Sequence, residues 1–353
     1  MQELVVNLHM HTRYSDGHAS HSEIARQAIL AGIDAVITTD HNILVKGIEG
    51  YYRQGSRRVL MLVGEEIHDQ ARNPQKSHLL VFGTGRELAP LAQNPQKLVD
   101  RVIQSGGLAF IAHPFEDALP LYNEDDISWE DWQVDGYTGI ELWNGMSEFK
   151  SVVKNRLQAI FYAFYPQYLG RGPLKRTLNK WDELLINGKH IVAIGGSDAH
   201  ALPARLGPIR RTIYPYQFHF RGINNHVIIS DGLTGNAPDD SRAILDAIKH
   251  GHSFVAYDLP APTNGFRFTA HATDGTFIMG DDVPLIGGVT FQIKLPLKVE
   301  SSLICNGQII KTWHEREFIT FAATRPGAYR VEAHINYLSK RRAWIFSNPI
   351  YVH

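Results

Sequence analysis

The sequence predicts an α/β fold followed by a smaller domain of β-strands alone. In the first part of the chain, apolar runs that read as strands alternate with segments of helical periodicity, which is typical of β-α-β units around a parallel sheet. After about residue 256, short β-rich runs alternate with turns such as Asn306-Gly307, and no helix-length periodic segment follows. We therefore predict two parts, residues 1–256 and a sandwich-like domain at residues 257–353.

The composition is that of an ordinary soluble globular protein, with 353 residues, of which 44% are hydrophobic and 20% charged. A net charge of −1 argues against a nucleic-acid partner and a polybasic membrane surface. The single cysteine, Cys305, excludes an internal disulfide and a cysteine-rich zinc module. Neither a secretory signal nor a membrane-spanning apolar run is visible, so we expect a cytoplasmic protein with a small-molecule substrate and no membrane partner.

The first predicted strand, residues 4–11, ends in two histidines. His9 and His11 are two positions apart, and this spacing places both side chains on one face of a strand. Asp16 follows in a turn, so the three residues fit half of a metal site. The pattern alone fits a half-buried strand with two hydrogen-bonded histidines equally well.

The next strand repeats this arrangement. The helix before it begins with a capping box of Ser20 and Glu23, and residues 35–39 are apolar enough for a buried strand. Asp40 and His41 follow that strand directly. The unit from the first strand to the second therefore reads as β-turn-α-β, which indicates a parallel sheet.

The later elements follow the same plan. The predicted strands are residues 59–63, 78–83, 108–112, 139–144 and 190–196, and the predicted helices are residues 95–105, most of 146–187, and 241–249. The strand ends and starts carry Glu66, His78, His113, Asp198 and His200. Because the C-terminal strand ends of a parallel barrel meet on one face, these side chains should converge there. A cluster of His, Asp and Glu of this size predicts a polynuclear metal site.

Several short motifs mark these strand ends. They are His9-x-His11, Tyr14-Ser15-Asp16-Gly17, Thr39-Asp40-His41, Gly64-x-Glu66, Ala112-His113-Pro114 and Ser197-Asp198-Ala199-His200. In kind and order they resemble the polymerase and histidinol phosphatase (PHP) superfamily. Residues 251–255 resemble the segment where the barrel of that family closes, and residues 344–352 resemble its carbaryl hydrolase-like branch.

The resemblance implies a distorted (β/α)7 TIM-like barrel that holds two to three divalent metal ions. Mixed histidine and carboxylate ligands suit zinc, manganese or iron. The implied ligands are His9, His11, Glu66 and Asp198 for the first ion, Glu66, His78 and His113 for the second, and Asp16, His41 and His200 for the third. We take Glu66 as the bridge, because the family pattern is Gly-x-Glu and Glu65 would point to the opposite strand face.

Other polar residues receive weaker predictions. Asp40 is interpreted as a support for the ligands or as the end of its strand. Glu141 and Asn144 match a Glu-x-x-Asn pattern of the family and could line the site or form a buried hydrogen bond to the barrel wall. The arginines Arg13, Arg171 and Arg205 could bind an anionic substrate. The remaining histidines, His18, His21, His68, His219, His226, His250 and His252, are interpreted as structural or solvent-facing.

The predicted reaction is hydrolysis by a hydroxide that bridges two metals, with Glu66, Asp198 and His200 as the catalytic residues. A phosphoesterase is the first interpretation. The second is a carbamate or carboxyl ester hydrolase with the same site, and the third is a non-catalytic regulatory module that binds metal. Cys305 lies in the β-domain, far from these motifs, so cysteine catalysis is not expected.

Overall fold

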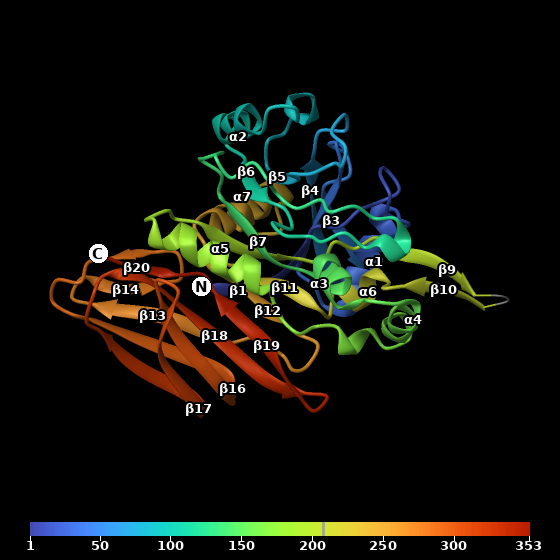
Figure 1. Ribbon diagram of the computed structural model, residues 1–353. Helices are drawn as coiled ribbons and strands as arrows, with labels where there is room; N and C mark the ends of the chain where they lie inside the picture. The colour runs from blue at the N-terminus through green and yellow to red at the C-terminus, as the bar shows by residue number, and fades with distance from the viewer. Residues whose placement is uncertain (207–208) are drawn as a thin grey trace.

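The computed structural model describes residues 1–206 and 209–353. Its N-terminal part combines helices with a large mixed sheet, and its C-terminal part is rich in strands (Figure 1). The strands of the first part are β1 (Gln2–Leu8), β2 (Ala35–His41), β3 (Gly50–Gln54), β4 (Arg57–Ile67), β5 (Leu79–Phe82), β6 (Leu108–Ile111), β7 (Gly139–Asn144), β8 (Val192–Gly196), β9 (Leu202–Leu206), β10 (Ile209–Ile213), β11 (Ile223–Ile229) and β12 (Ser253–Tyr257). The helices are α1 (His21–Ala31), α2 (Pro95–Gln104), α3 (Gly145–Val152), α4 (Arg156–Phe164), α5 (Lys175–Ile186), α6 (Tyr216–His219) and α7 (Ala237–Lys249).

The sheet of the first part curves back on itself. Strands β1, β2 and β4 are parallel neighbours, as are β6, β7 and β8. The chain after β8 returns to the chain after β1 through a parallel bridge between Met10 and Ala199. The predicted number of barrel strands stays a prediction, but the predicted uniformly parallel order is wrong, because β5 runs antiparallel to both β4 and β6.

Alternating apolar residues build the inside of this curved sheet. Leu4, Val6 and Leu8 of β1 pack in one cluster with Leu60 and Leu62 of β4. The period of two expected for a strand sends the residues between them to the other face, where the Met61 side chain packs against α1 residues. The predicted capping box of α1 is confirmed, since Ser20 and Glu23 each accept a hydrogen bond from the backbone of the other.

Three strand regions escaped the sequence prediction, namely β3, the hairpin of β9 and β10, and β11. In β11 the residues Asn224, Asn225 and His226 interrupt the apolar run and give it the look of a loop. All three are buried, because each has a partner in the fold. Asn225, for example, exchanges two hydrogen bonds with the backbone of Gly195 in β8.

The C-terminal part contains strands only, as predicted. They are β13 (Arg267–Ala272), β14 (Gly275–Ile278), β15 (Asp282–Val283), β16 (Val289–Cys305), β17 (Gln308–Ala323), β18 (Gly327–Tyr337), β19 (Lys340–Ser347) and β20 (Ile350–Val352). The first half of β16 pairs with β13 and its second half with β18, so this long strand joins two groups of strands around one apolar core. Because β12 pairs with β19, the sheet continues across the predicted boundary at residue 256, and that boundary stays a prediction.

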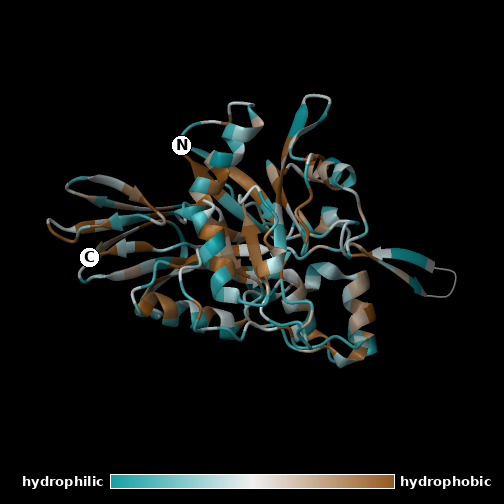
Figure 2. Ribbon diagram, turned by 90° about the horizontal axis from the view of Figure 1, so that it is seen from above, coloured by the Kyte–Doolittle hydropathy of each residue, from teal (hydrophilic) through white to brown (hydrophobic). Residues whose placement is uncertain are grey.

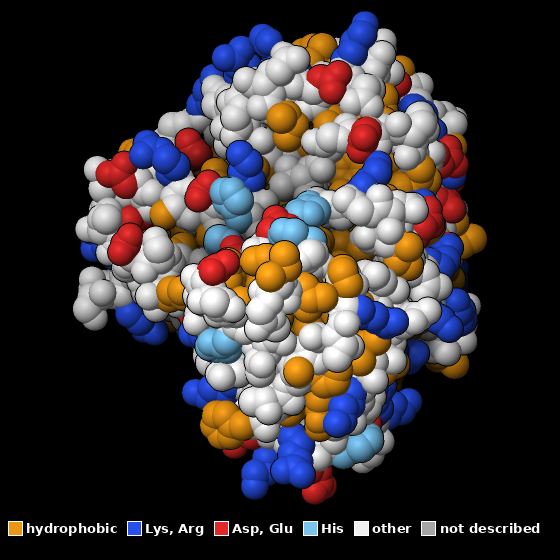
Figure 3. Space-filling view, turned by 90° about the vertical axis from the view of Figure 1, so that its left-hand side faces the viewer, with side chains coloured by type: hydrophobic (Ala, Val, Ile, Leu, Met, Phe, Trp, Pro, Cys, Tyr) orange, Lys and Arg blue, Asp and Glu red, His pale blue; other side chains and the backbone are white. Residues whose placement is uncertain are grey.

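The outer surface is mixed in character. Figure 2 shows hydrophobic and hydrophilic residues mixed along the C-terminal strands, whereas central strands such as β5 and β6 are apolar throughout. On the face shown in Figure 3, Lys and Arg side chains are interspersed with acidic and hydrophobic ones, in keeping with a net charge of −1. None of the helices in the described residues is both long and apolar enough to span a membrane.

Candidate metal centre

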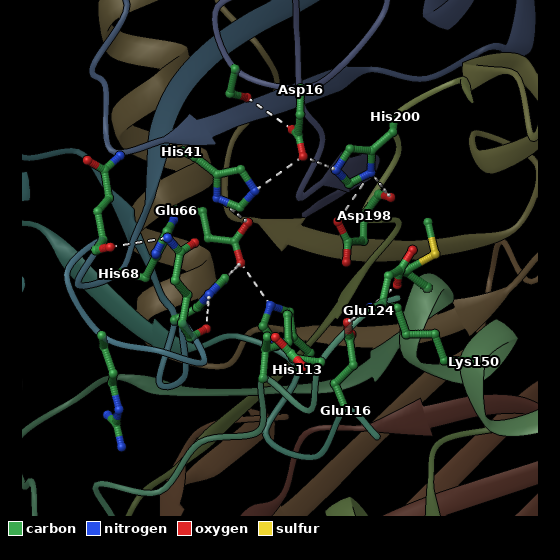
Figure 4. Close-up of a pocket in the computed structure, with 18 of the residues that line it drawn as sticks. Asp16, His41, Glu66, His68, His113, Glu116, Glu124, Lys150, Asp198 and His200 are labelled. Carbon is green, nitrogen blue, oxygen red and sulfur yellow. Dashed lines mark hydrogen bonds and ion pairs between the residues drawn. The ribbon is translucent and has the colours of Figure 1, made fainter. Parts of the chain in front are cut away.

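The strand ends bring a group of histidine and carboxylate side chains to one rim of the curved sheet (Figure 4). They border a cavity of about 950 Å³. All nine residues that the sequence singled out as ligands are in this group: His9, His11, Asp16, His41, Glu66, His78, His113, Asp198 and His200. Their role as ligands stays a prediction, and the following geometry supports it.

Strand periodicity explains how Glu66 reaches the site. Leu60 and Leu62 point into the inner core, so Glu66, with the same parity on β4, points the same way at the rim. Its neighbour Glu65 faces away, as the sequence predicts, and lies beside Glu87. His78 reaches the same rim from the start of β5, because β5 runs antiparallel to its neighbours.

Three of the residues reach the site through an unusual backbone. His9, His113 and Asp198 have positive φ angles of 62°, 24° and 49°. A positive φ is uncommon for residues other than glycine and costs free energy that the surrounding structure must supply. Leu8 and Ala112 point into the inner core, and the turn of the backbone after each lets the next residue also face inward. Strained residues of this kind are typical of functional sites.

Glu66 lies at the centre of the group. Its Oε1 is 2.7 Å from Nδ1 of His78 and 2.8 Å from Nε2 of His113. Its Oε2 is 3.1 Å from Nε2 of His9 and 3.2 Å from Nε2 of His11. The same oxygen is 3.5 Å from Nδ1 of His41, so one carboxylate faces five imidazoles through two oxygens, an arrangement that suits a bridging ligand.

Asp16 forms a second focus with two histidines. Its Oδ2 is 3.2 Å from Nε2 of His200 and 3.6 Å from Nε2 of His41. Asp40 holds the loop that carries Asp16, because its carboxylate accepts hydrogen bonds from the Thr12 backbone and from the hydroxyl of Ser15, both at 2.7 Å. Asp40 therefore fixes the loop that carries Asp16 and is not itself a member of the candidate ligand group.

Asp198 connects the two foci. Its Oδ1 lies 3.3 Å from Nε2 of His11 and 3.5 Å from Nε2 of His9. The ligand atoms of these three residues lie within 4.8 Å of one another, as do those of the group of His11, Asp16, His41 and His200. These two groups match the first and third predicted ion sites, with Glu66 absent from the first and His11 added to the third.

The groups around Glu66 differ from the predicted second site. Glu66 falls into one group with His9 and His113 and into another with His41 and His78. The predicted second site combined His78 with His113. Glu66 therefore belongs to both groups, which agrees with a bridging position. The histidines that accompany it in each group differ from the predicted set.

The donor atoms fit divalent cations. The ring nitrogens Nε2 of His11, Nδ1 of His41 and Nδ1 of His113 are buried without a hydrogen-bond partner among the described residues. Buried polar atoms are normally paired, so an absent partner needs an explanation. Imidazole nitrogens and carboxylate oxygens together suit zinc, manganese and iron, and a bound cation would pair these nitrogens.

The charges of the group stabilise one another. Burial lowers the pKa of His11, but Asp198 and Glu66 outweigh burial and raise it to about 10. Burial likewise opposes the charge on His113, and Glu116 and Glu66 raise its pKa to about 9. Burial alone would raise the pKa of Glu66, yet the surrounding histidines hold it well below its ordinary value. Cations that replace these imidazole protons would face the same carboxylates, so metal binding should release protons.

Glu141 and Asn144 support the group from behind. Glu141 is buried and accepts a hydrogen bond from the His113 backbone at 2.7 Å, and its Oε1 lies 2.6 Å from Nδ1 of His9. Asn144 donates hydrogen bonds to Glu141 at 2.9 Å and to Asp198 at 3.3 Å. A carboxylate on the second nitrogen of a ligand histidine fixes its ring and tautomer. Both residues therefore hold ligands in place, and neither is placed to contact substrate.

Gly196 allows this close packing. A Cβ atom at this position would lie 1.6 Å from Oε1 of Glu141 and 2.9 Å from Cβ of His9. Any side chain there would push Glu141 away from His9.

The three arginines predicted to bind substrate do not border the cavity. Arg13 pairs with Glu23 in α1, and its side chain is 61% exposed. Arg171 bonds to the hydroxyl of Tyr162, and Arg205 stands on the hairpin of β9 and β10. The geometry gives no support to the prediction that they bind an anion at the site.

Several polar residues of the cavity were not assigned to it by the sequence analysis, among them His68, Glu116 and Lys150. His68 was interpreted as structural, but it borders the cavity, and its ring stacks on that of His78 with a centroid distance of 4.3 Å. Glu116 and Lys150 form a buried ion pair of 2.5 Å at the opposite wall. His68 follows Glu66 by two positions, so the same spacing that places His9 and His11 on one strand face could have predicted His68 beside Glu66. Lys150 carries no such signal, because it lies on the helix α3, to which strand periodicity does not apply.

The fold and the group of His, Asp and Glu side chains define an α/β domain with a candidate metal centre at its strand ends. Residues 7–161 match the family described as PHP domain. This part of the chain is therefore similar to PHP domains, in agreement with the motifs. Asp198 and His200 lie beyond the matched range, and the resemblance of residues 344–352 to the carbaryl hydrolase-like branch stays a prediction.

Three individual proteins are similar to this chain. An uncharacterized protein of Methanocaldococcus jannaschii is 25% identical over 120 residues, which cover 31% of this chain and 67% of that protein. A structure from Bacteroides vulgatus, a two-domain protein containing a predicted PHP-like metal-dependent phosphoesterase, covers 99% of this chain and 95% of its own at 15% identity and a TM-score of 0.46. A provisionally assigned metal-dependent phosphoesterase of Bifidobacterium adolescentis covers 57% of this chain and 90% of its own, at 17% identity and a TM-score of 0.34.

Proposed function

We propose that the chain is a metal-dependent hydrolase that cleaves a small-molecule phosphate ester. The observation that carries this proposal is the convergence of Glu66 and eight further His and Asp side chains beside one cavity. A site with this many cation ligands would be costly to bury without a cation, since each charge must be desolvated. The PHP domain match and the names of the two solved structures agree with this chemistry.

Within this proposal the residues of the chain have distinct tasks. Glu66 would join two ions, while Asp198 and the flanking histidines complete their ligands. When bound, the ions would acidify a shared water as the nucleophile and neutralise the charge that develops on the phosphoryl oxygens. Glu141 holds His9, and Asp40 holds the loop of Asp16, so the ligand positions are set before substrate binds.

The cavity has room for more than a phosphoryl group. Its volume of about 950 Å³ is at the upper end of small-molecule sites. Two cationic side chains, Arg72 and Lys150, line its walls at some remove from Glu66. We propose that the alcohol part of the ester occupies this space.

Phosphate esters are preferred over carbamate and carboxyl esters on electrostatic grounds. Two or three divalent ions offer more positive charge than the transition state of acyl transfer requires. A phosphoryl group carries several oxygens and can contact all of the ions at once.

The test uses the purified full chain loaded with zinc, manganese or iron. Its turnover should be measured with p-nitrophenyl phosphate, the corresponding phosphodiester, and a p-nitrophenyl carbamate and acetate. Metal-dependent release of p-nitrophenol from a phosphate ester is the expected result. Turnover of the carbamate or acetate alone would reverse the preferred order, and retained metal without any turnover would favour a non-catalytic module.

A further inference from the structure

A row of apolar side chains on α4 is largely exposed. Only Ala159 and Tyr162 of this helix are buried, in a small core together with Leu119. The exposed fractions of its other large residues are high: Leu157 79%, Ile160 45%, Phe161 43% and Phe164 39%, followed by Tyr165 at 51%. Contiguous apolar surface of this kind on a soluble protein is typical of an interaction site.

The hairpin of β9 and β10 projects from the body next to this helix, on the side away from the C-terminal strands (Figures 1 and 2). It forms a two-stranded sheet separate from the main one. An isolated hairpin is only marginally stable in water, so contact with a further protein surface would stabilise this one. The guanidinium of Arg211 lies 4.7 Å from the ring centre of Phe164, so hairpin and helix form one continuous surface.

Charges of opposite sign flank the apolar row. Residues 149–181, which contain α4, include seven Lys or Arg and no Asp or Glu, and the hairpin carries Arg205, Arg210 and Arg211 with no acidic residue. In contrast, residues 116–126 contain five Asp or Glu and no Lys or Arg, and four of the five (Glu116, Asp117, Glu124 and Asp126) also pair with a Lys or Arg elsewhere in the chain. This acidic loop borders the same surface, because its Leu119 packs against Ala159 of α4. Asp125 and Arg156 form no ion pair with any residue that the structure describes.

We propose that this surface, the α4 face, joins two copies of the chain around a twofold axis. We define it by the apolar row of α4, the hairpin of β9 and β10, and the acidic loop at residues 116–126. A twofold interface must be complementary to itself. The α4 face has an apolar centre, and at its edges lie the arginine-bearing hairpin of β9 and β10 (the basic arm) and the acidic loop. The basic arm of each copy would lie on the acidic loop of the other.

A second copy of the chain would offer an acidic loop to the basic arm and a basic arm to the acidic loop. An anionic membrane would attract the arginines and the aromatic residues of α4, but it would repel the acidic loop beside them. The proposal does not depend on the proposed reaction, because it makes no use of metal or substrate.

The first test is the oligomeric state of the purified full chain, measured by sedimentation velocity over a range of concentrations. The chain mass is 39.7 kDa, and we expect a species of twice that mass. Leu157→Glu with Phe161→Glu should give the single-chain mass. Ile309→Glu with Phe318→Glu is the matched control, because both residues are apolar and 67% exposed on β17 and should leave the dimer intact.

The second test exchanges the charges. Arg210→Glu with Arg211→Glu, and separately Asp117→Lys with Asp125→Lys, should each weaken the dimer by about tenfold or more. A mixture of the two variants should restore it, because the changed arm then meets the changed loop. Restoration also shows that both variants are folded.

Three results would overturn the proposal. One is a wild-type chain that stays at 39.7 kDa at every concentration. Another is a dimer that survives the changes in α4. The third is a monomer that binds phosphatidylserine vesicles through α4, which would assign the face to a membrane.

Discussion

Glu66 and Glu65 are adjacent carboxylates with opposite surroundings. Glu66 faces five imidazoles, and these hold its pKa well below the ordinary value. Glu65 is fully buried on the other face of β4, where burial and Glu87 raise its pKa to about 9. At neutral pH the first is therefore charged and the second is neutral, although both have the same side chain.

This difference predicts unequal effects of the same substitution. Glu66→Gln removes the charge at the centre of the ligand group, and we expect turnover to fall about a hundredfold or more, with loss of bound metal. Glu65→Gln replaces a neutral carboxylic acid by a neutral amide of the same shape and should cost much less. Metal analysis by mass spectrometry, together with turnover, checks both. Equal losses in the two variants would contradict the assignment of Glu66.

His68 offers a test at the wall of the cavity. Its ring stacks on that of His78 at an interplanar angle of 17°, and stacking of this kind holds His78 toward Glu66. His68→Asn should lower kcat/KM by about tenfold, within the range for residues that support metal ligands.

A second variant separates packing from polar contact. His68→Phe keeps an aromatic ring and should recover most of the activity if the role is to position His78. A loss as large as in His68→Asn would mean that a ring nitrogen contacts the substrate. His21→Asn, at a buried histidine outside the cavity, is the matched control and should leave kcat/KM unchanged.

At the scale of elements, His226 joins β11 to two other segments. Its Nδ1 lies 2.8 Å from Glu3 of β1, and its Nε2 lies 3.2 Å from Asp258 after β12. Burial lowers the pKa of His226, but the two carboxylates outweigh burial and raise it to about 9. The imidazole is therefore charged in the folded chain at neutral pH.

This raised pKa predicts a dependence of stability on pH. An unfolded histidine has a pKa of about 6.5, so the ion pair stabilises the fold fully below that pH, and the stabilisation is lost as the pH rises through about 9. The difference corresponds to roughly 3 kcal/mol in the free energy of unfolding. Urea unfolding between these two pH values should show a steeper decline in the wild type than in His226→Gln, which keeps the contributions of His11 and His113. His314→Gln, at an exposed histidine, should keep the wild-type slope.

The helices and strands differ in how well the sequence predicts them. Strand periodicity and capping chemistry predict β1, β2, β4, α1 and α2, because these elements are locally consistent. The polar residues of β11 hide a strand that only distant partners such as Gly195 make possible. The reversed direction of β5 depends on its neighbours and leaves no mark on its own residues.

The candidate site follows the same division. Glu66 and His9 follow apolar strands, and that position marks them in the sequence. Glu116 and Lys150 come from a loop and a helix, and only the fold brings them to the cavity. Arg13 has a local partner in Glu23, which draws it away from the site where sequence proximity had placed it.

At the scale of the whole molecule, we expect the candidate ligand group to contribute more to stability when cations fill it. Without metal, buried carboxylates must rely on imidazole protons for their charge balance. Binding to the folded state alone adds about 4 kcal/mol when free metal is a thousandfold above its Kd. We expect chelation with EDTA to lower the Tm by several degrees, and added zinc or manganese to restore it.

The same experiment with Glu66→Gln serves as the control. This variant should have a low Tm with or without EDTA, because it binds little metal. A wild-type Tm that does not respond to chelation or to added metal would contradict the metal-site assignment.

The two parts of the chain are joined through Asn348, which lies between β19 and β20. This residue is buried, its Oδ1 accepts a hydrogen bond of 2.8 Å from Ala193 of β8, and its Nδ2 donates to Ala193 and to Ser253 of β12, each at 3.1 Å. β8 leads directly to Asp198, so the C-terminal part supports a strand of the candidate site. The pairing of Phe254 with Ser347 adds a continuous sheet across the same junction.

These contacts predict that the two parts unfold together. Independent domains would give two calorimetric transitions, whereas the shared sheet and the Asn348 contacts should give one. Asn348→Ala leaves the backbone groups of Ala193 and Ser253 without partners, and we expect it to lower the free energy of unfolding by about 2–4 kcal/mol while the transition stays single. Asn336→Ala, on a partly exposed part of β18, is the control and should cost far less. Two separate transitions in the wild type, or residues 1–256 that fold stably alone, would instead establish the boundary that the sequence predicts.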